Sequence, residues 1–471
     1  MLGRTRRVHF VGIGGIGMSG IAELLANLGY AVTGSDAQRS PMTERLRTLG
    51  IEVSYGHRAE QVADADVVVV SSAVRSTNPE VVEAARRQIP VIPRAEMLAE
   101  LMRLRFAVAV AGAHGKTTTT SMIAVMLERA GLDPTAVIGG RLHAFGSNAR
   151  LGRGDLMVAE ADESDRSFLK LYPTVAVLTN IDAEHLESYK DFADLQQAFV
   201  DFANKVPFYG SVVACMDDEH VRGVLPRITR RVMTYGLDHA SDVSASQVAL
   251  SPAGVSATIS RRTSGGAEPA RLGELTLSVP GRHNLQNALA AVAVGLDLDL
   301  SFDRIARALA EFRGVERRFD VRGEPGGILV VDDYGHHPTE IAAVLAVAKS
   351  FGRRTVVAFQ PHRYTRTAAL MQAFGPALAA ADRIVLTDIY PAGEDPLPGV
   401  TLDALADSIR QATVAPLDVV RRIDDVVPFL AGILRPRDLV IMLGAGSIGG
   451  QADRLVAHLT GTRDRAGSTT T

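Results

Sequence analysis

Two glycine-rich turns carry most of the chemistry that this sequence offers. The first is the run 12–17, Gly-Ile-Gly-Gly-Ile-Gly, which follows the apolar run 8–11. The second is the run 112–117, Gly-Ala-His-Gly-Lys-Thr, which follows the apolar run 108–111. A strand, a tight glycine turn and a helix start expose backbone N–H groups that favour an anion. The pair of turns predicts a protein that binds two phosphorylated ligands at once.

The first turn matches the dinucleotide-binding fingerprint. Asp36 follows the second expected strand, about where a ribose-binding acid belongs. A nicotinamide cofactor is one interpretation of these residues. The other is that the glycines only allow the helix to pack closely on the strand.

The second turn is more specific because it adds side-chain chemistry to backbone geometry. Lys116 can place a point charge on the β- and γ-phosphates of a nucleotide, and the Thr117 hydroxyl can ligate Mg²⁺. Val110 stands where the standard spacing has glycine, so the loop is shortened. The alternative interpretation is a threonine-rich helix start without a ligand.

Glu160 and His185 each follow an expected strand, at 156–159 and 175–179. The carboxyl edge of a parallel sheet is where ligands bind, so this pair could complete a magnesium shell or hold phosphate oxygens. Histidine is the less usual ligand for Mg²⁺. Taken alone, a residue of either kind is more often an ordinary polar surface residue than a ligand.

Two later motifs, 332–338 and 360–366, also follow expected strands. Arg363 and Arg366 are three residues apart, so they share a face if a helix begins there and could clamp a carboxylate. A solvated basic helix start is the alternative. The pair Arg317-Arg318 has the same ambiguity.

The elements that position these residues alternate between strand and helix patterns, as in parallel α/β domains. We expect strands at 8–11, 31–34, 67–71, 106–111, 156–159, 175–179, 212–214, 328–331, 355–359, 383–386 and 439–443. We expect helices at 19–28, 95–102, 116–129 and 287–296, and a more β-like stretch at 243–279. A second domain is expected to start near residue 100 and a third after Arg313, in agreement with the length of 471 residues.

Composition excludes several classes of protein. Lys+Arg 50 against Asp+Glu 53 leaves a formal charge of -3, so no global basic field recruits nucleic acid. No apolar run approaches the roughly 20 residues that span a bilayer, and residues 1–7 lack the pattern of a signal peptide. The single cysteine, Cys215, is expected in a core and fits a reducing cytoplasm. Residues 461–471 are small and polar and are expected to be disordered.

Six motifs resemble, in order, those of the Mur ligases, and they cover most of the chain. They are the runs 12–19, 112–120, 160–164, 180–185, 281–287 and 332–338. The resemblance implies three α/β domains: a Rossmann-like UDP-sugar domain at 1–98, a P-loop-type ATP domain at 99–312 and a Rossmann-like C-terminal domain at 313–460. The first turn would then hold a UDP diphosphate in place of NAD.

The activity that the resemblance implies is an ATP-dependent, ADP-forming amide-bond ligase of cytoplasmic peptidoglycan precursor synthesis. Its substrates would be ATP with Mg²⁺, UDP-N-acetylmuramate and L-alanine. The lactyl carboxylate would attack the γ-phosphate to give an acyl phosphate, which the alanine amine then attacks. The C-terminal domain would carry the amino acid and close over the acyl phosphate, which excludes water.

The resemblance also implies roles for individual residues, taken position by position. Those implied for UDP-sugar binding are Gly14, Gly15, Ile16, Gly17, Asp36, Ser71 and Ser72. Those implied for ATP are Gly112, Ala113, His114, Gly115, Lys116, Thr117, Thr118, Asn284, Asn287, Arg318 and Asp333. Those implied for the metal are Thr117, Glu160 and His185, and those for the amino acid are Tyr334, His336, Arg363 and Arg366. Those implied for catalysis are Lys116, Glu160, His185, Arg318 and His336, the last as a base.

One position departs from the wider family. Several relatives carry a carbamylated lysine near the metal, but Phe202 takes that position here and Lys205 does not fit the alignment. We therefore expect no such modification, as in the alanine-adding subgroup. His114 is typical of that subgroup, whereas Ala113 replaces a frequent threonine.

Three other functions stay open at this point. A recycling ligase that joins a whole peptide to the same sugar acid would need a larger amino-acid pocket. A nicotinamide dehydrogenase would leave the second turn unexplained. A nucleotide-regulated binding module would bind ATP without catalysis. For the ligase itself we expect no membrane insertion, and a monomer or weak homodimer.

Overall fold

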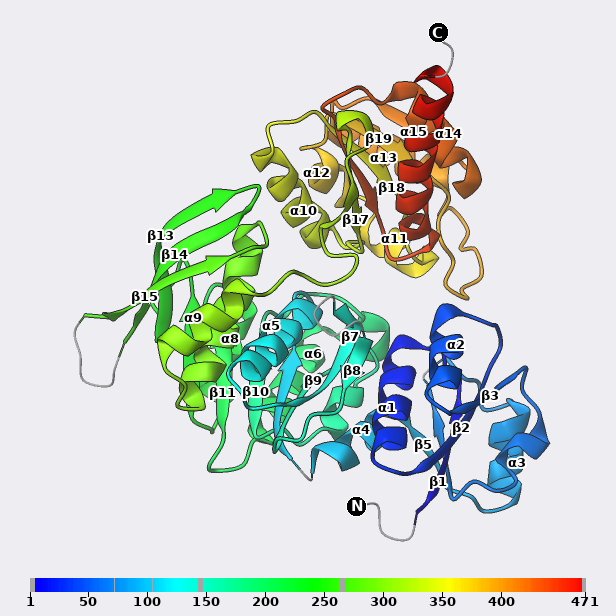
Figure 1. Cartoon of the computed structure of the whole chain (residues 1–471), viewed down its shortest axis with the longest axis vertical. Coiled ribbons are helices and arrows are strands. Elements are labelled where there is room, and N and C mark those ends of the chain that lie inside the picture. The colour runs from blue at the N-terminus through cyan, green and yellow to red at the C-terminus, as the bar shows by residue number, and fades with distance from the viewer. Residues whose placement is uncertain (1–4, 72, 104, 143–146, 263–267, 468–471) are drawn as a thin grey trace. The chain divides into compact units, whose positions relative to one another are not determined.

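The computed structural model describes residues 5–71, 73–103, 105–142, 147–262 and 268–467 (Figure 1). Within these ranges, the side chains of residues 16, 140–142, 147–148 and 462–467 are not described. The chain divides into two compact units, Met1–Ala249 with Val255–Arg313, and Leu250–Gly254 with Gly314–Thr471.

The first unit begins with a parallel sheet of strand order β3-β2-β1-β4-β5. Its strands are β1 Arg7–Val11, β2 Ala31–Asp36, β3 Glu52–Tyr55, β4 Val67–Val70 and β5 Val91–Pro93. Its helices are α1 Ile16–Asn27, α2 Pro41–Thr48, η1 Ala59–Val62, α3 Pro79–Arg86 and α4 Arg94–Met102. The Val-rich strands are buried because helices cover both faces, as parallel sheets require.

The same unit contains a larger mixed sheet of order β15-β14-β13-β12-β11-β10-β6-β9-β7-β8. Its strands are β6 Phe106–Ala111, β7 Thr135–Leu142, β8 Ser147–Arg150, β9 Leu156–Glu160, β10 Val175–Leu178, β11 Ser211–Cys215, β12 Val232–Gly236, β13 Val243–Ser251, β14 Gly254–Arg261 and β15 Ala270–Leu277. Its helices are α5 Lys116–Arg129, η2 Ser167–Lys170, η3 Leu186–Ser188, α6 Phe192–Asn204, α7 Glu219–Val224, η4 Leu225–Arg227, α8 Arg282–Asp297 and α9 Phe302–Ala310. The centre of this sheet consists of parallel strands, β6, β9, β10 and β11. Their carboxyl ends lie at one edge of the sheet, so the second glycine turn and the polar residues that follow these strands lie at that edge.

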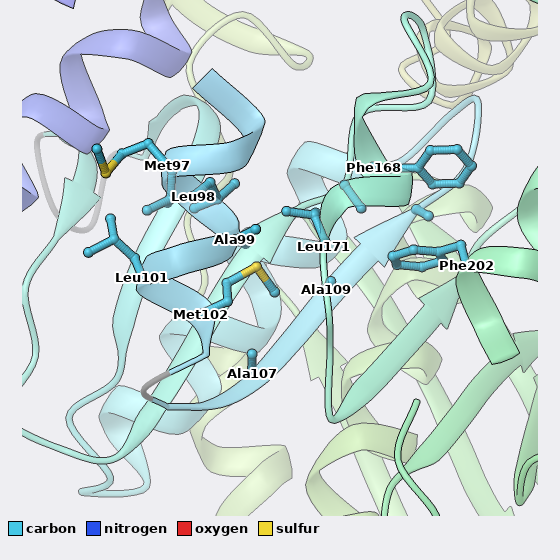
Figure 2. Close-up of a cluster of buried hydrophobic side chains, with 14 of the residues drawn as sticks. Met97, Leu98, Ala99, Leu101, Met102, Ala107, Ala109, Phe168, Leu171 and Phe202 are labelled. Atoms are coloured by element: carbon cyan, nitrogen blue, oxygen red, sulfur yellow. The ribbon is translucent and has the colours of Figure 1, made fainter. Parts of the chain in front are cut away.

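Helix α4 links the two sheets of this unit through a continuous core. Figure 2 shows Ala99 and Met102 on the side of α4 that faces Leu171 and β6, with Phe168 and Phe202 farther along the same cluster. These side chains are buried. The helix therefore shares one buried core with both sheets of this unit.

The second unit is a sheet of order β16-β17-β21-β18-β19-β20 with helices on both faces. Its strands are β16 Asp320–Gly323, β17 Leu329–Asp333, β18 Thr355–Phe359, β19 Arg383–Leu386, β20 Leu417–Val419 and β21 Leu439–Leu443. Its helices are η5 Pro325–Gly327, α10 Pro338–Ser350, α11 Tyr364–Leu370, α12 Phe374–Leu378, α13 Leu402–Ala412, α14 Ile423–Ile433, η6 Ser447–Gly449 and α15 Gly450–Gly467. Except for the antiparallel edge strand β16, the strands are parallel.

The expected strands and helices are confirmed, with two corrections at helix starts. α1 begins at Ile16, not at Ser19, because the turn glycines lead directly into the helix. α8 begins at Arg282, not at Asn287, after Gly281 at a φ of +104°. α15 is helical to Gly467, beyond residue 461 where we expected order to end. Cys215 is buried, as expected.

Among the described residues, no helix combines the length and apolarity that crossing a bilayer would require.

Candidate active site

The first glycine turn connects β1 to α1 and rests on the end of β2. Gly12 has a φ of +79°, and the backbone N–H groups of Gly12 and Ile13 donate to the Ser35 carbonyl at 2.8 and 2.9 Å. Asp36 accepts a hydrogen bond from the Gly14 N–H through Oδ2 at 2.8 Å. The predicted acid and the predicted turn therefore meet directly.

The other residues predicted for the UDP-sugar lie around the same turn where they are described. Gly15 is the exposed N-cap of α1, and Ile16 is the first residue of that helix. The Ser71 hydroxyl lies 3.4 Å from where a Cβ on Gly12 would stand. Ser72 lies outside the described residues.

Arg94 also reaches this turn, and the sequence analysis missed it. A Cβ on Gly17 would lie 2.5 Å from the Arg94 guanidinium, so the arginine packs directly over the start of α1. The same guanidinium is 3.4 Å from the carboxylate of Asp162, in the larger sheet. Arg94 thus adds a cation between the two turns, and only its place at the start of α4 after Pro93 hinted at this.

The second turn requires glycine at both ends. Gly112 has a φ of +144°, and a Cβ there would collide with the Thr179 hydroxyl. Gly115 has a φ of +79° as the N-cap of α5, and a Cβ there would lie 2.7 Å from Asn287 Oδ1. Close approach by neighbouring side chains, besides the left-handed backbone, explains both glycines.

The centre of the second turn is braced by the segment that follows β10. The His114 N–H donates to Asn180 Oδ1 at 2.8 Å, and its carbonyl accepts from Asn180 Nδ2 at 2.9 Å and from Thr179 Oγ1 at 2.7 Å. The His114 ring lies 2.9 Å from Asp182. Ala113 donates its N–H to the Asn180 carbonyl at 3.3 Å. The loop is thus held through its backbone, which explains why an alanine fits at 113.

Lys116 is the first residue of α5, and its ammonium makes three hydrogen bonds. It donates to the carbonyls of Gly112 at 2.6 Å and Ala113 at 3.2 Å, and to Glu163 Oε1 at 2.8 Å. Burial raises the pKa of Glu163 to about 7, in spite of the adjacent ammonium. Glu163 lies in the motif 160–164, but no role was expected for it from the sequence.

Glu160 ends β9 directly beside the second turn's strand, in register with Val110. Its Oε1 accepts a hydrogen bond from the Gly139 N–H at 2.7 Å. Burial lowers the pKa of Lys116, but the carboxylates of Glu163, Asp162 and Glu160 raise it overall. The structure therefore groups Glu160 with the lysine, and Thr117 and Thr118 follow that lysine in the first turn of α5.

His185 belongs to a second group of charges, after β10. It has a φ of +58°, and its ring nitrogens lie 3.6 Å from Glu184 and 3.8 Å from Glu187. A ring nitrogen of His114 lies within 4.8 Å of a Glu184 carboxylate oxygen. Through Glu184, His185 is therefore near the second turn.

Asn284 and Asn287 lie in the first two turns of α8, which packs along α5. Asn287 Oδ1 accepts a hydrogen bond from the Thr119 hydroxyl at 3.2 Å. Asn284 Nδ2 donates to the Pro280 carbonyl at 2.7 Å. Asn287 therefore contacts the second turn, whereas the described contact of Asn284 is within its own segment.

In the second unit, Arg318 and Asp333 lie together at the end of β17. Arg318 is 3.1 Å from Glu340, and its guanidinium lies over the ring of Tyr334 at 5.4 Å. Asp333 accepts from the N–H groups of Phe319 and Gly335, each at 2.7 Å. Burial raises the pKa of Asp333 to about 6, although Arg318 lowers it.

Tyr334, His336 and His362 form an aromatic cluster at the same edge. The ring of His336 lies 5.6 Å from that of Tyr334 and 5.5 Å from that of His362, which stacks on Tyr390 at 5.6 Å. Burial lowers the pKa of His336 to about 3, so this ring is neutral at pH 7. No role was expected for His362 or Tyr390 from the sequence, and only the strand-end position of the run 360–366 pointed to His362.

Arg363 and Arg366 do not share a helix face. Arg363 is the N-cap of α11 with a φ of +69°, and only Arg366 is helical. Arg363 lies 3.9 Å from Glu394, and Arg366 lies 3.2 Å from His362 Nδ1. The structure brings Arg366, His362 and His336 together, and Arg363 faces a carboxylate instead.

Phe202 is fully buried and stacks on Phe168 at 5.1 Å between ring centres. Lys205 is the C-cap of α6. Its ammonium donates a hydrogen bond to the Leu169 carbonyl and lies over the Tyr172 ring. Both residues belong to the packing around η2.

Family models match almost the whole chain. The Mur ligase family catalytic domain matches residues 7–106, the Mur ligase middle domain 110–295, and the Mur ligase glutamate ligase domain 317–446. The chain therefore belongs to the Mur ligase family, and the predicted architecture of three α/β domains is confirmed.

Individual proteins similar to this chain include two UDP-N-acetylmuramate–alanine ligases and a murein peptide ligase. A UDP-N-acetylmuramate--L-alanine ligase of Geobacter sp. (strain M21) is 53% identical over 98% of this chain and 100% of its own. The crystal structure of UDP-N-acetylmuramate-alanine ligase from Thermotoga maritima has a TM-score of 0.83 at 31% identity, over 97% of this chain and 99% of that one. A murein peptide ligase from Psychrobacter arcticus has a TM-score of 0.71 at 25% identity, over 96% and 98%.

Proposed function

We propose that this chain is an ATP-dependent ligase that joins L-alanine to the lactyl carboxylate of UDP-N-acetylmuramate. The observation that carries the proposal is full-length identity of 53% to a ligase of that name. The paired phosphate turns support it independently, because the reaction needs a nucleotide and a UDP-sugar together. We also propose that the reaction takes place in the cytoplasm and that its product enters peptidoglycan precursor synthesis.

The chemistry is two transfers. A lactyl carboxylate oxygen attacks the γ-phosphorus, the bond to the β-phosphate oxygen breaks, and ADP leaves. The alanine amine then attacks the acyl carbon, a C–N bond forms, and phosphate leaves while the amine loses a proton. Both reactants of the first transfer are anions, so cations must offset their repulsion.

The first unit supplies those cations and the nucleotide cradle. Lys116 offsets charge on the β- and γ-phosphates, and the N–H groups of the second turn bind phosphate oxygens. Arg94 lies between the turns and offsets charge where the sugar carboxylate approaches. Asp36 and Ser71 line the first turn and orient the UDP-sugar.

Mg²⁺ fits the donor set around Lys116. A hydroxyl from Thr117 and a carboxylate from Glu160 are oxygen ligands of the kind that Mg²⁺ prefers. His185 would face a second ion through the Glu184 group. The ion supplies charge neutralisation on the transferred phosphoryl group.

The second unit supplies the amino-acid pocket. Arg366 binds the alanine carboxylate, and Tyr334, His336 and His362 surround the small side chain. Arg318 and Asp333 are the residues of this unit that we propose to contact ATP. His336 as the proton acceptor stays a prediction, since a pKa of about 3 makes the ring a weak base before substrate binds.

The test is phosphate release by the purified chain with ATP, Mg²⁺ and UDP-N-acetylmuramate, using alanine, glycine, serine and a tripeptide as amine donors. We expect alanine to give the highest kcat/KM. A preference for the tripeptide would instead identify the recycling peptide ligase. Phosphate release without any donor dependence would contradict both.

A further inference from the structure

The ammonium of Lys116 is saturated in the nucleotide-free structure. A lysine has three N–H donors, and these have three acceptors within 3.2 Å: two carbonyls of its own loop and Glu163 Oε1. A phosphate oxygen can therefore gain this ammonium only if one present acceptor loses it.

Glu163 is the acceptor built for this exchange. Its side chain is 3% exposed, and within the described part of the chain its second oxygen, Oε2, is buried without a hydrogen-bond partner. A buried carboxylate with one empty oxygen is a strong acceptor for an ammonium. Loop carbonyls are neutral and hold the lysine less firmly.

The backbone of Glu163 is fixed independently of its side chain. Its carbonyl accepts hydrogen bonds from the Tyr189 hydroxyl and from the Arg166 N–H, and the Arg166 guanidinium lies over the Tyr189 ring at 4.7 Å. Neighbouring Asp162 pairs with Arg94. Among the described residues, Lys116 is the cation paired with the Glu163 carboxylate, and the backbone that carries this carboxylate is held in place.

We propose that Glu163 is a positioning residue that holds Lys116 in the empty site and is displaced from it by the incoming phosphate. The proposal rests on the proposed function, because it assumes that Lys116 contacts nucleotide phosphate. Nucleotide binding then transfers the ammonium from the carboxylate to the phosphate. Glu163 stabilises the empty loop and lowers nucleotide affinity.

The direct test is the Kd of a non-hydrolysable ATP analogue with Mg²⁺, measured by calorimetry without sugar or amino acid. A hydrogen bond between charged groups is worth about ten-fold in an equilibrium constant. Glu163→Gln should therefore bind the analogue about ten-fold more tightly. Glu96→Gln is the matched control, because Glu96 forms an exposed pair with Lys170 in the same unit, and its Kd should equal that of the wild type.

A double-mutant cycle shows whether the effect passes through the lysine. In a Lys116→Met background, Glu163→Gln should leave the Kd unchanged, since there is no ammonium to release. Weaker or equal binding by Glu163→Gln alone, or an equal gain in the Lys116→Met background, would overturn the proposal.

A second measurement covers the case in which the double variant does not fold. At pH 8, analogue binding to the wild type should take up a proton, because Glu163 loses its counter-ion, and Glu163→Gln should take up none. Uptake that is equal in both would contradict the exchange. Phosphate release by the wild type, run in parallel, separates failure of this inference from failure of the proposed function.

Discussion

Asn287 Oδ1 lies 2.7 Å from where a Cβ on Gly115 would stand, so α8 closes directly on the turn that begins α5. The same oxygen accepts a hydrogen bond from Thr119. One amide side chain thereby connects the second glycine turn and α5 to α8.

Gly115→Ala should destabilise the first unit by about 2–3 kcal/mol, from left-handed strain plus the contact with Asn287. Gly131→Ala is the matched control, because Gly131 has a φ of +76° with nothing within 4 Å of its Cβ position. The difference between the two variants in urea unfolding measures the contact alone. If both variants lost the same free energy of unfolding, the Asn287 side chain would move aside at no measurable cost.

Lys116→Ala should lower kcat/KM for ligation by at least about a hundred-fold, because it removes a charge aimed at the transferred phosphoryl group. UDP-sugar affinity should stay within about two-fold, since that ligand's turn is at the other sheet. Steady-state kinetics measures the fall in kcat/KM, and a direct binding measurement gives the UDP-sugar affinity. Loss of both together would contradict the division of the two phosphate sites.

Arg366→Ala should raise the KM for alanine by about ten- to a hundred-fold, since a charge-assisted pair to the carboxylate is lost. The KM values of this variant for ATP and UDP-N-acetylmuramate should equal those of the wild type. Arg410→Ala, which breaks an exposed pair with Asp407 in the same unit, serves as the control. An unchanged alanine KM would place the carboxylate elsewhere.

The stability of the second unit should depend on His362 at acid pH. Burial and the nearby Arg366 and Arg363 lower the pKa of this ring from 6.5 to about 4. Between these values the unfolded chain binds more protons, so the free energy of unfolding falls as the pH falls from 6.5 to 4. His362→Asn should remove about 2 kcal/mol of that fall.

The comparison of wild type and variant is needed because Asp332 and Asp333 have pKa values raised to about 6, chiefly by burial. Their effect has the opposite sign: stability falls as the pH rises from about 4 to 6. Parallel pH profiles for wild type and His362→Asn would contradict the assignment.

The features that could be predicted from the sequence are those set by short-range patterns. Strands such as β6 and β18 and the helix α5 follow from continuous apolar runs and from the glycine turn before Lys116. Strand ends then located Glu160 and Asp333, since parallel strands share a carboxyl edge. These inferences need no knowledge of distant contacts.

The missed residues depend on contacts far apart in the chain. Arg94 reaches Gly17 and Asp162 only because α4 packs between two sheets. Glu163 looks no different from Asp162 in the sequence, and its burial beside Lys116 separates them. Arg363 was expected to share a helix face with Arg366, but it is the N-cap of α11, and the positive φ of that position has no signal in the sequence.

In the proposed reaction, a nucleoside triphosphate activates the sugar-borne carboxylate by phosphoryl transfer. The most direct measurement supplies UDP-N-acetylmuramate with an ¹⁸O-labelled lactyl carboxylate, together with ATP and L-alanine, and analyses the released phosphate by mass spectrometry. If the carboxylate is phosphorylated, each phosphate released with amide product should carry one labelled oxygen. Unlabelled phosphate formed alongside the amide would contradict it.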